Sequence, residues 1–169
     1  MVTNDEALAA RIRRLRNGGQ ANRYEHVEFG VNSRLDEIQA AVLRARLTLL
    51  PQWTATRRRL AARYRAELAH STVDVPPEVD PGHVYHLLVV LAGGSERRVR
   101  LRRHLDACGI ETLVHYPTAI PAQSAVARCH PADCPVAARV CSQVVSLPLH
   151  PGLDEASVAL VADAVRRFS

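Results

Sequence analysis

The sequence predicts an α/β protein in two unlike halves, and three observations carry that prediction. In the second half, short apolar runs alternate with helical segments, a pattern typical of a small sheet with helices packed on it. The first half shows helical periodicity almost throughout and contains no sheet for its helices to cover. Apolar residues make up 47% of the 169 residues but aromatic residues only 4%, so the core has to be built from Ala, Val and Leu.

The first half begins with a helix predicted over residues 4–16. Thr3 and Glu6 have the spacing of a capping box. Apolar residues then recur at helical intervals, at Leu8, Ile12 and Leu15. Two glycines at 18–19 are expected to end this helix. The polar segment 20–29 has no clear periodicity and is predicted to be a loop, where ligand-binding groups are common.

A second helix is predicted to begin near Ser33, with Asp36 and Glu37 in its first turn. Its apolar stripe consists of Leu35, Ile38, Val42, Ala45 and Leu49. Pro51 interrupts the pattern, and a third helix follows that turns inward Leu60, Tyr64 and Leu68. Arginines within 57–65 are expected to lie mostly outward. A solvated helix face explains this run better than nucleic-acid binding, because no stacking aromatic residues or known binding motif accompany it.

The second half follows a connection rich in Pro and Asp, residues 71–82. Strands are predicted at residues 84–91, 110–115 and 144–147, and helices at 96–108, at 135–141 and from Asp154 onward. Residues 117–134 form a long proline-bearing loop, of a length that is usually functional or mobile. The last helix is expected to bury Val158, Val161, Val165 and Phe168.

The sequence contains arginine but no lysine. Its net charge is +5, and all 22 residues of the Lys and Arg class are arginines. A guanidinium stays protonated in proteins and is not an amine nucleophile. No side chain of this sequence can therefore form a Schiff base with a carbonyl compound.

The sequence also bears on compartment and metal binding. It has no apolar run of membrane-spanning length and no signal-peptide pattern after Met1, which favours a cytoplasmic protein with no membrane partner. The four cysteines are too sparse for a disulfide framework and are expected to be reduced thiols. Cys129, His130 and Cys134, with Cys141 further on, resemble a metal-binding cluster. Their spacing is not a common zinc spacing and no second ligand pair follows, so no metal is predicted.

Two segments carry candidate ligand-binding groups. Asn32 and Arg34 are predicted to lie at the start of the second helix, where backbone N–H groups and the helix dipole favour a phosphate or a carboxylate. Alternatively, Asn32 caps the helix and Arg34 pairs with a carboxylate of its first turn. His115 and Tyr116 end a predicted strand and enter the long loop. A ligand contact and a structural bond to the backbone are both open for this histidine.

Seven segments together resemble the DegT/DnrJ/StrS-type sugar aminotransferases, in the same order as in that family. They are residues 2–5, 16–20, 23–26, 30–41, 84–87, 109–117 and 146–152. The resemblance covers only the C-terminal portion of that family's polypeptide. It implies an α/β fold, the C-terminal part of a fold-type I PLP-dependent transferase with long linking helices. Residues 1–50 would be a remnant of the PLP-binding large domain, and residues 51–169 the small α/β domain, with helices packed on a short sheet.

The resemblance implies pyridoxal phosphate as cofactor and a bacterial aminotransferase, usually a homodimer, of deoxysugar biosynthesis. Its substrates would be a keto sugar nucleotide, or a related keto sugar or cyclitol, with glutamate or glutamine as amino donor. Asn32 matches an asparagine that reaches across the dimer to the cofactor phosphate. Arg34 matches an arginine near the amino-donor carboxylate or the substrate. The remaining matches line the substrate entrance or a neighbouring loop, namely His115, Tyr116, Tyr24 and His26.

The sequence departs from the family pattern in two ways. The Schiff-base lysine, the aspartate facing the pyridine nitrogen and the stacked aromatic ring all belong upstream of Met1, which resembles a cut through a larger gene. Pro121 stands where the family often has a second histidine. We therefore expect no catalytic residue here and no activity from this chain alone, as in a truncated aminotransferase. The alternative is a non-catalytic split or helper subunit that lends Asn32 and Arg34 to a partner chain's PLP site.

Both hypotheses predict exposed apolar stripes on the helices at 4–16 and 34–50. A partner chain or self-association would be needed to cover them.

Overall fold

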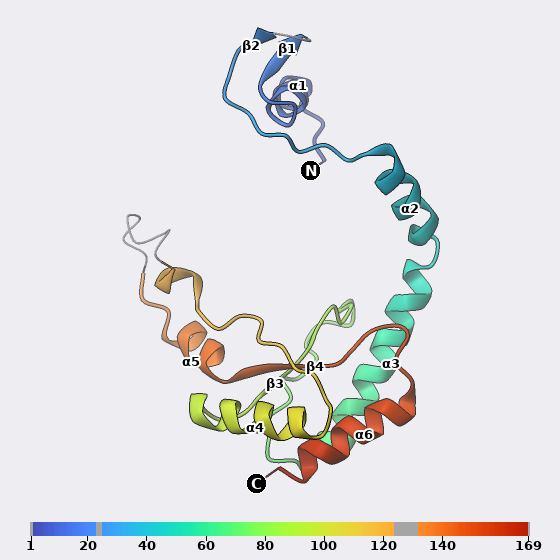
Figure 1. Ribbon diagram of the computed structural model, residues 1–169, viewed down its shortest axis with the longest axis vertical. Coiled ribbons are helices and arrows are strands. Elements are labelled where there is room, and N and C mark those ends of the chain that lie inside the picture. Colours follow the sequence, from blue (N-terminus) through green and yellow to red (C-terminus); the bar gives the residue numbers. More distant parts are fainter. Residues whose placement is uncertain (1, 23–24, 124–131, 169) are drawn as a thin grey trace. The chain divides into compact units, whose positions relative to one another are not determined.

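The computed structural model describes residues 2–22, 25–123 and 132–168. Its contacts divide the chain into two compact units, Met1–Leu49 and Leu50–Ser169 (Figure 1).

The first unit begins with helix α1 (Glu6–Leu15). Asp5 caps this helix, because its carboxylate accepts the backbone N–H of Leu8 at 3.0 Å. The predicted capping box is therefore wrong: Thr3 lies outside the helix and its hydroxyl accepts the N–H of Asp5 at 3.1 Å. The glycines at 18–19 follow the helix with φ angles of 71° and 76°, which confirms that they end it.

A short antiparallel hairpin occupies part of the segment predicted to be a loop. Strand β1 (Gln20–Asn22) pairs with strand β2 (Glu25–His26). Strands of two and three residues are too short to show an alternation of polar and apolar residues, so the sequence pattern gave no sign of them.

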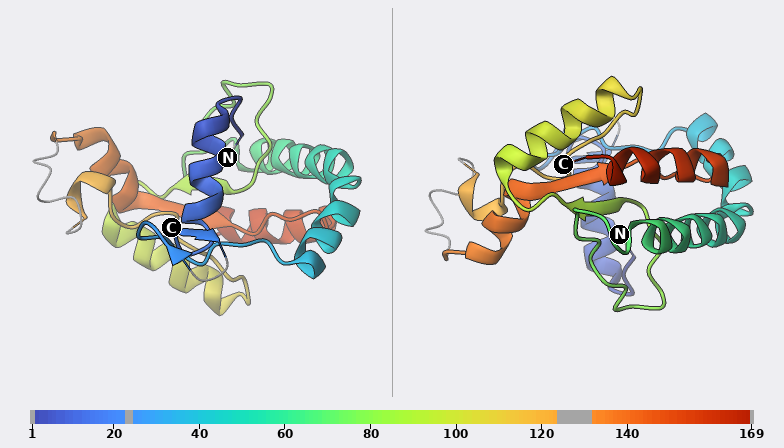
Figure 2. Two further views of the ribbon diagram at one scale, coloured as in Figure 1. Left: turned by 90° about the horizontal axis from the view of Figure 1, so that it is seen from above. Right: turned by 90° about the horizontal axis from the view of Figure 1, so that it is seen from below.

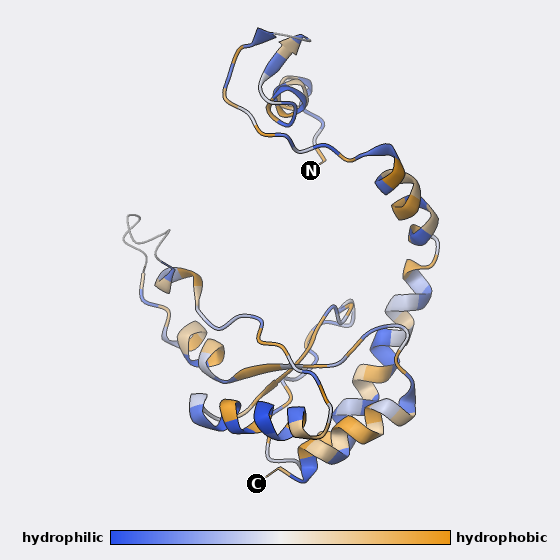
Figure 3. Ribbon diagram, viewed as in Figure 1, coloured by the Kyte–Doolittle hydropathy of each residue, from blue (hydrophilic) through white to orange (hydrophobic). Residues whose placement is uncertain are grey.

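Helix α2 (Glu37–Leu47) starts later than the predicted position near Ser33, with Asp36 as its N-cap. No residue of α1 or α2 is buried, and on α2 Ile38 is 81% and Leu47 64% exposed. Apolar residues recur along α2 in Figure 3. The prediction of an exposed apolar stripe is confirmed for α2, whereas on the stripe of α1 only Leu8 is exposed and Ile12 and Leu15 are half-buried. The first half contributes almost nothing to a buried core.

The second unit packs a small sheet against helices. Strands β3 (Leu88–Leu91) and β4 (Val144–Leu147) are antiparallel, with Leu88 opposite Leu147 and Leu91 opposite Val144. Helices α4 (Ser95–Ala107) and α6 (Glu155–Arg166) lie on one side of these strands, and helix α3 (Leu50–Leu68) packs against α6 (Figures 1 and 2). The predicted inward residues of the third and last helices are all buried: Leu60, Tyr64, Leu68, Val158, Val161, Val165 and Phe168.

The sheet is wider than its two strands, because single residue pairs extend it at both edges. Asp74 pairs with Leu91 on one side, and Leu113 pairs with Ser146 on the other. The predicted strand at 110–115 is thus reduced to one bridge at Leu113. The predicted strand at 84–91 starts only at Leu88, because Tyr85 has a φ of 48° and breaks the extended backbone.

The arginines of α3 were predicted to lie mostly outward, and for three of them this is wrong. Arg57, Arg58 and Arg65 are half-buried and donate hydrogen bonds to backbone carbonyls of the connection at 76–84. The connection has few backbone partners of its own, so these guanidinium groups satisfy its carbonyl groups. The run of arginines therefore has a structural role within the second unit.

The remaining elements are a 3₁₀ turn, η1 (Ile120–Ala122), and helix α5 (Pro135–Gln143). Cys129 and His130 lie outside the described residues. Cys108, Cys134 and Cys141 are free thiols, as predicted. Within residues 2–22, 25–123 and 132–168, no three His, Cys, Asp or Glu side chains are grouped so that they could hold a metal ion. None of the helices in these ranges combines the length and apolarity that crossing a membrane requires.

Tyr64 joins α3 to the segment after β4. Its side chain is fully buried, burial raises its pKa, and its hydroxyl donates a hydrogen bond to the carbonyl of Pro148 at 3.0 Å. We expect Tyr64→Phe to lower the free energy of unfolding by about 1–2 kcal/mol, because a partly buried hydrogen bond is lost. Urea unfolding followed by circular dichroism measures this. Tyr116→Phe is the control, since that side chain is 68% exposed, and an equal loss in both variants would contradict the prediction.

The carboxylate of Glu78, which contacts Arg58 of α3, predicts a loss of stability in acid. Glu78 accepts a hydrogen bond from the hydroxyl of Tyr85 and forms an ion pair of 3.1 Å with Arg58, and these contacts lower the pKa of Glu78. Because the pKa is lower in the folded than in the unfolded state, this stabilisation is complete above the unfolded pKa and is lost as the pH falls through the folded one. We expect Glu78→Gln to lose less stability than the wild type between neutral pH and about pH 3 in urea titrations, because that range passes below the unfolded pKa of a glutamate of about 4.3. Equal losses in both proteins would contradict this.

Candidate functional site

Asn32 lies in an extended segment that is paired with the end of α1. Residues 31–33 run antiparallel to residues 15–18, joined by three backbone hydrogen bonds of 2.8 to 3.0 Å. Asn17 is the bridge partner directly opposite Asn32. The position of Asn32 is therefore fixed by backbone pairing with a segment about fifteen positions earlier in the sequence.

Two glycines allow this close approach of backbones. A Cβ atom on Gly30 would lie 2.2 Å from the backbone nitrogen of Gly19 and 2.5 Å from the carbonyl oxygen of Leu15. A Cβ atom on Gly19 would lie 1.7 Å from the carbonyl oxygen of Glu28. The Glu28 carboxylate adds an ion pair of 3.0 Å to Arg14 of α1. Only glycine fits at positions 19 and 30 of this arrangement.

Asn32 and Arg34 form a hydrogen-bonded pair, in which Nε of Arg34 donates to Oδ1 of Asn32 at 3.0 Å. Their predicted place at a helix start is wrong, because pairing with α1 keeps the segment extended and α2 begins only at Glu37. Both alternatives are wrong as well. Asp36 is the N-cap in place of Asn32, and among the described residues no carboxylate lies within ion-pair distance of Arg34.

This pairing determines which donors the two side chains present. Arg34 can only donate, so the oxygen of the Asn32 amide faces it and the amide nitrogen faces away. The terminal nitrogens of the Arg34 guanidinium have no hydrogen-bond partner among the described residues, and both side chains are exposed. The pair thus offers hydrogen-bond donors and one positive charge, which suit an anionic oxygen ligand.

His26 is engaged within its own hairpin. Its Nδ1 lies 2.7 Å from the carbonyl oxygen of Gly18, which can only accept, so Nδ1 carries a proton. Its Nε2 lies 3.3 Å from the side-chain amide nitrogen of Gln20. Both ring nitrogens therefore help to hold the hairpin. Tyr24, the other residue predicted in this loop, lies outside the described residues.

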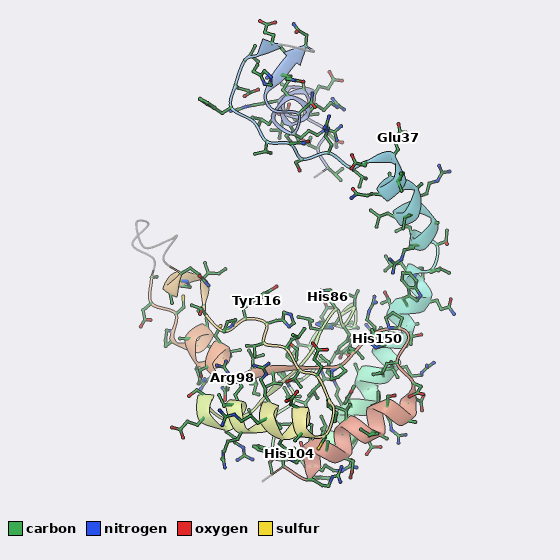
Figure 4. All side chains as sticks on the ribbon, viewed as in Figure 1. Glu37, His86, Arg98, His104, Tyr116 and His150 are labelled. Carbon is green, nitrogen blue, oxygen red and sulfur yellow. The ribbon has the colours of Figure 1, made fainter. Side chains whose placement is uncertain are left out.

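His115 and Tyr116 lie together in the second unit, with ring centroids 5.5 Å apart and nearly perpendicular rings. Nδ1 of His115 is 2.9 Å from Oγ of Ser146 on β4. One of the two hypotheses for His115 was a hydrogen bond to the backbone. In the structure the hydrogen-bond partner of its ring is instead the side chain of Ser146. Figure 4 shows Tyr116 and His86 on the side of the sheet away from α4.

An open pocket of about 320 Å³ adjoins His115 on this side of the sheet. It is lined by Leu87, Glu111, Leu113, His115 and residues 146–150. Sequence reasoning did not select Glu111, Ser146 or His150. A signal was available for Glu111: in an extended segment, positions 111, 113 and 115 face the same side, so the residue two before Leu113 joins His115.

The structure therefore brings the predicted site residues together in two separate pairs. Asn32 and Arg34 belong to the first unit, and His115 and Tyr116 to the second.

Comparison with known proteins identifies the class of this chain. The DegT/DnrJ/EryC1/StrS aminotransferase family matches residues 1–166. This chain belongs to that family.

Individual relatives agree with this assignment. The dTDP-3-amino-3,4,6-trideoxy-alpha-D-glucose transaminase of Streptomyces venezuelae is 45% identical over 175 residues, covering 100% of this chain and 45% of that protein. The UDP-2-acetamido-2-deoxy-3-oxo-D-glucuronate aminotransferase of Pseudomonas aeruginosa is 39% identical, covering 98% of this chain and 45% of that protein. The crystal structure of S. venezuelae DesV, 46% identical, superposes with a TM-score of 0.80 over 98% of this chain and 45% of that one.

The chain thus spans a little under half the length of the relatives it matches. The predicted fold class, the C-terminal part of an α/β PLP-dependent transferase, is confirmed.

Proposed function

We propose that this chain supplies the C-terminal part of a PLP-dependent aminotransferase that acts on a keto sugar nucleotide in the bacterial cytoplasm. Glutamate or glutamine would be the amino donor. Family membership supports the reaction class, and relatives named as transaminases or aminotransferases of dTDP- and UDP-linked sugars support the substrate class. The observation that carries the proposal is the Asn32–Arg34 pair, a cluster of free hydrogen-bond donors on a segment held by backbone hydrogen bonds to the end of α1.

The donors of this pair fit the anionic groups of such a reaction. The Asn32 amide nitrogen would donate to the phosphate of pyridoxal phosphate, which is held mainly by another part of the enzyme. The Arg34 guanidinium would bind the carboxylate of the amino donor through its two free nitrogens. Bound pyridoxal phosphate supplies the electron sink for the transfer of the amino group. The contribution of this chain is to orient the two anions.

The pocket beside His115 would contact the sugar. It combines a carboxylate at Glu111 with the imidazoles of His115 and His150, and such groups hydrogen-bond sugar hydroxyls. Tyr116 is 68% exposed beside it and would line the substrate entrance. His26 would act by holding the hairpin of β1 and β2, since both of its ring nitrogens have partners.

The chemistry would need a lysine that this sequence does not contain. In this proposal the lysine belongs to another polypeptide segment, and the present chain alone is inactive. That segment is either the remainder of a longer chain or a separate PLP-bearing partner, to which this chain would be a helper subunit. The exposed apolar residues of α2 would then be covered by the partner or by a second copy in a homo-oligomer.

A chimera tests the proposal. In it, this chain replaces the matching 45% of the S. venezuelae transaminase, and transfer of the amino group from glutamate to a keto sugar nucleotide is followed. We expect activity in the chimera and none in this chain alone. We also expect Arg34→Ala to raise the KM for glutamate by about 100-fold, because a charged hydrogen-bonded contact is lost.

Arg103→Ala is the matched control, an exposed arginine of α4 with no ion pair among the described residues, and should leave the KM unchanged. A folded chimera without activity would count against the proposal. Mixing this chain with a separately expressed PLP-bearing segment distinguishes the helper subunit, which would bind it and change its visible absorbance.

A further inference from the structure

We infer that Ser146 is a positioning residue that makes His115 a hydrogen-bond donor toward the pocket, so that His115 binds a ligand oxygen and does not act as a base. The identity of that ligand, a sugar nucleotide, rests on the proposed function. The arrangement of the two side chains does not.

The backbone fixes Ser146 on the side of the sheet that faces the pocket. Its N–H donates to the carbonyl of Leu113 at 2.8 Å, and its carbonyl accepts the N–H of Leu113 at 3.2 Å. Directly paired residues of antiparallel strands point to the same face, so Ser146 shares its face with Leu113 and with Val89 of β3. Leu88 and Val90 point to the opposite face, into the core. His115 follows Leu113 by two positions and covers the Ser146 hydroxyl.

Ser146 is an unusual residue for its surroundings. It is only 5% exposed, and Thr112 is the other buried polar residue in the described part of the chain. The Thr112 hydroxyl accepts a hydrogen bond from Arg102, whereas His115 Nδ1 is the one hydrogen-bond partner of the Ser146 hydroxyl among the described residues. A buried hydroxyl in the middle of a strand destabilises the fold unless it is hydrogen-bonded. His115 therefore satisfies it.

The direction of this bond follows from counting protons. A serine hydroxyl has one proton to donate, and leaving it without an acceptor in a buried place is unfavourable. If Nδ1 carried the proton of the neutral ring, the hydroxyl proton would have no acceptor. The hydroxyl therefore donates to Nδ1, and the neutral imidazole carries its proton on Nε2. That nitrogen lies on the other side of the ring and has no partner among the described residues.

Protonation of the ring leaves this outcome unchanged. In the imidazolium form, Nδ1–H has to donate to the Ser146 oxygen, although this leaves the hydroxyl proton without an acceptor among the described residues, and Nε2 keeps its proton. His115 thus presents an N–H to the pocket in both charge states. The matching ligand group is an acceptor oxygen, and the carboxylate of Glu111, which lines the same pocket, could accept a hydrogen bond from a ligand hydroxyl. A hydroxylated ligand such as a sugar offers both an acceptor oxygen for His115 and a hydroxyl donor for Glu111.

Nitrogen NMR of the histidine-labelled chain tests the inference without any need for activity. At a pH where the ring is neutral, we expect the His115 proton on Nε2 and Nδ1 in the shift range of a hydrogen-bonded acceptor. Ser146→Ala should move the Nδ1 signal to that of an unbonded ring, and Ser146→Thr, which keeps the hydroxyl, should restore it. Thr112→Val removes the other buried hydroxyl and should leave the His115 signals unchanged. A neutral ring protonated on Nδ1 in the wild type would overturn the inference.

The chimera described above adds a kinetic readout. Loss of an oriented donor should raise the KM for the keto sugar nucleotide about tenfold in Ser146→Ala, with little change in kcat. His115→Gln places an amide nitrogen near the position of Nε2 and should retain more affinity than His115→Asn. A fall in kcat with KM unchanged would show that His115 takes part in proton transfer and would overturn the donor role. An inactive but folded chimera would refute the proposed function, and the NMR result would still decide the role of Ser146.

Discussion

Gly30→Ala is expected to break the pairing between residues 31–33 and the end of α1, and with it the position of Asn32. The new Cβ would lie 2.2 Å from the Gly19 nitrogen and 2.5 Å from the Leu15 carbonyl oxygen. Both are backbone atoms, which cannot move aside as a flexible side chain can. Overpacking of a tight contact costs about 1–3 kcal/mol, and a backbone clash of this size belongs at the upper end.

Amide hydrogen exchange gives the direct measurement. The N–H groups of Gly18, Val31 and Ser33 all donate across this pairing. We expect them to exchange about 100-fold faster in Gly30→Ala, because the pairing opens without unfolding of the second unit. Amides of β3 and β4 should be unaffected. In Gly19→Ala, where the clash is at 1.7 Å and φ is 76°, the effect should be at least as large.

Gly152→Ala provides the matched substitution. A Cβ at this position has no neighbour nearer than 3.4 Å, and that neighbour is the side chain of His150. The amide exchange rates of Gly18, Val31 and Ser33 in Gly152→Ala should therefore match those of the wild type. Unchanged protection of Val31 in Gly30→Ala would mean that the loop accommodates a side chain and that its geometry does not depend on glycine.

The second unit shows how far the sequence predicts the fold. Helices α4, α5 and α6 lie within two residues of their predicted bounds, since boundary residues such as Gly109, Pro135 and Asp154 are local signals. Asp154 caps α6 as predicted, accepting the N–H of Ser157 at 2.7 Å. Strand β4 also matches, because all four of its residues are buried and form one apolar run interrupted only by Ser146.

The first unit shows where local signals fail. The helix predicted from Ser33 has acidic residues and apolar spacing in its favour, but pairing with the end of α1 holds this segment extended. That pairing is a contact between distant positions, which no local pattern encodes. The glycines at 19 and 30 are the sequence feature that this pairing requires. Their role can be recognised only from the structure, because it depends on the close approach of the two backbones.

The candidate site follows the same division. Asn32, Arg34, His115 and Tyr116 could be selected from their places beside predicted elements and from the resemblance of their segments to a known family. Their partners could not, since the bond between Arg34 and Asn32 depends on the extended backbone and that between His115 and Ser146 on the register of β4. A register shift of one residue would point Ser146 into the core.

Asn32→Asp is expected to abolish cofactor binding in the chimera while leaving the fold intact. An aspartate at this position would accept the Arg34 Nε–H as the amide oxygen does, and the exposed ion pair so formed changes stability by less than about 1 kcal/mol. The other carboxylate oxygen would replace the amide nitrogen, so a donor becomes a negative charge. If this position faces the phosphate, the change removes one hydrogen bond and adds repulsion between the carboxylate and the phosphate. We therefore expect the affinity for pyridoxal phosphate to fall about 100-fold or more.

Retention of the cofactor on dialysis, followed by its visible absorbance, measures this effect, and thermal unfolding checks the fold. Asn4→Asp makes the same change of charge at an exposed position before α1, where the helix dipole tolerates it, and should retain the cofactor fully. If Asn32→Asp also retains it, the asparagine does not face the phosphate, and the role assigned to the pair falls to Arg34 alone. If cofactor is lost with the fold intact, the phosphate contact belongs to this loop, and the chain contributes to cofactor binding although it contains no lysine.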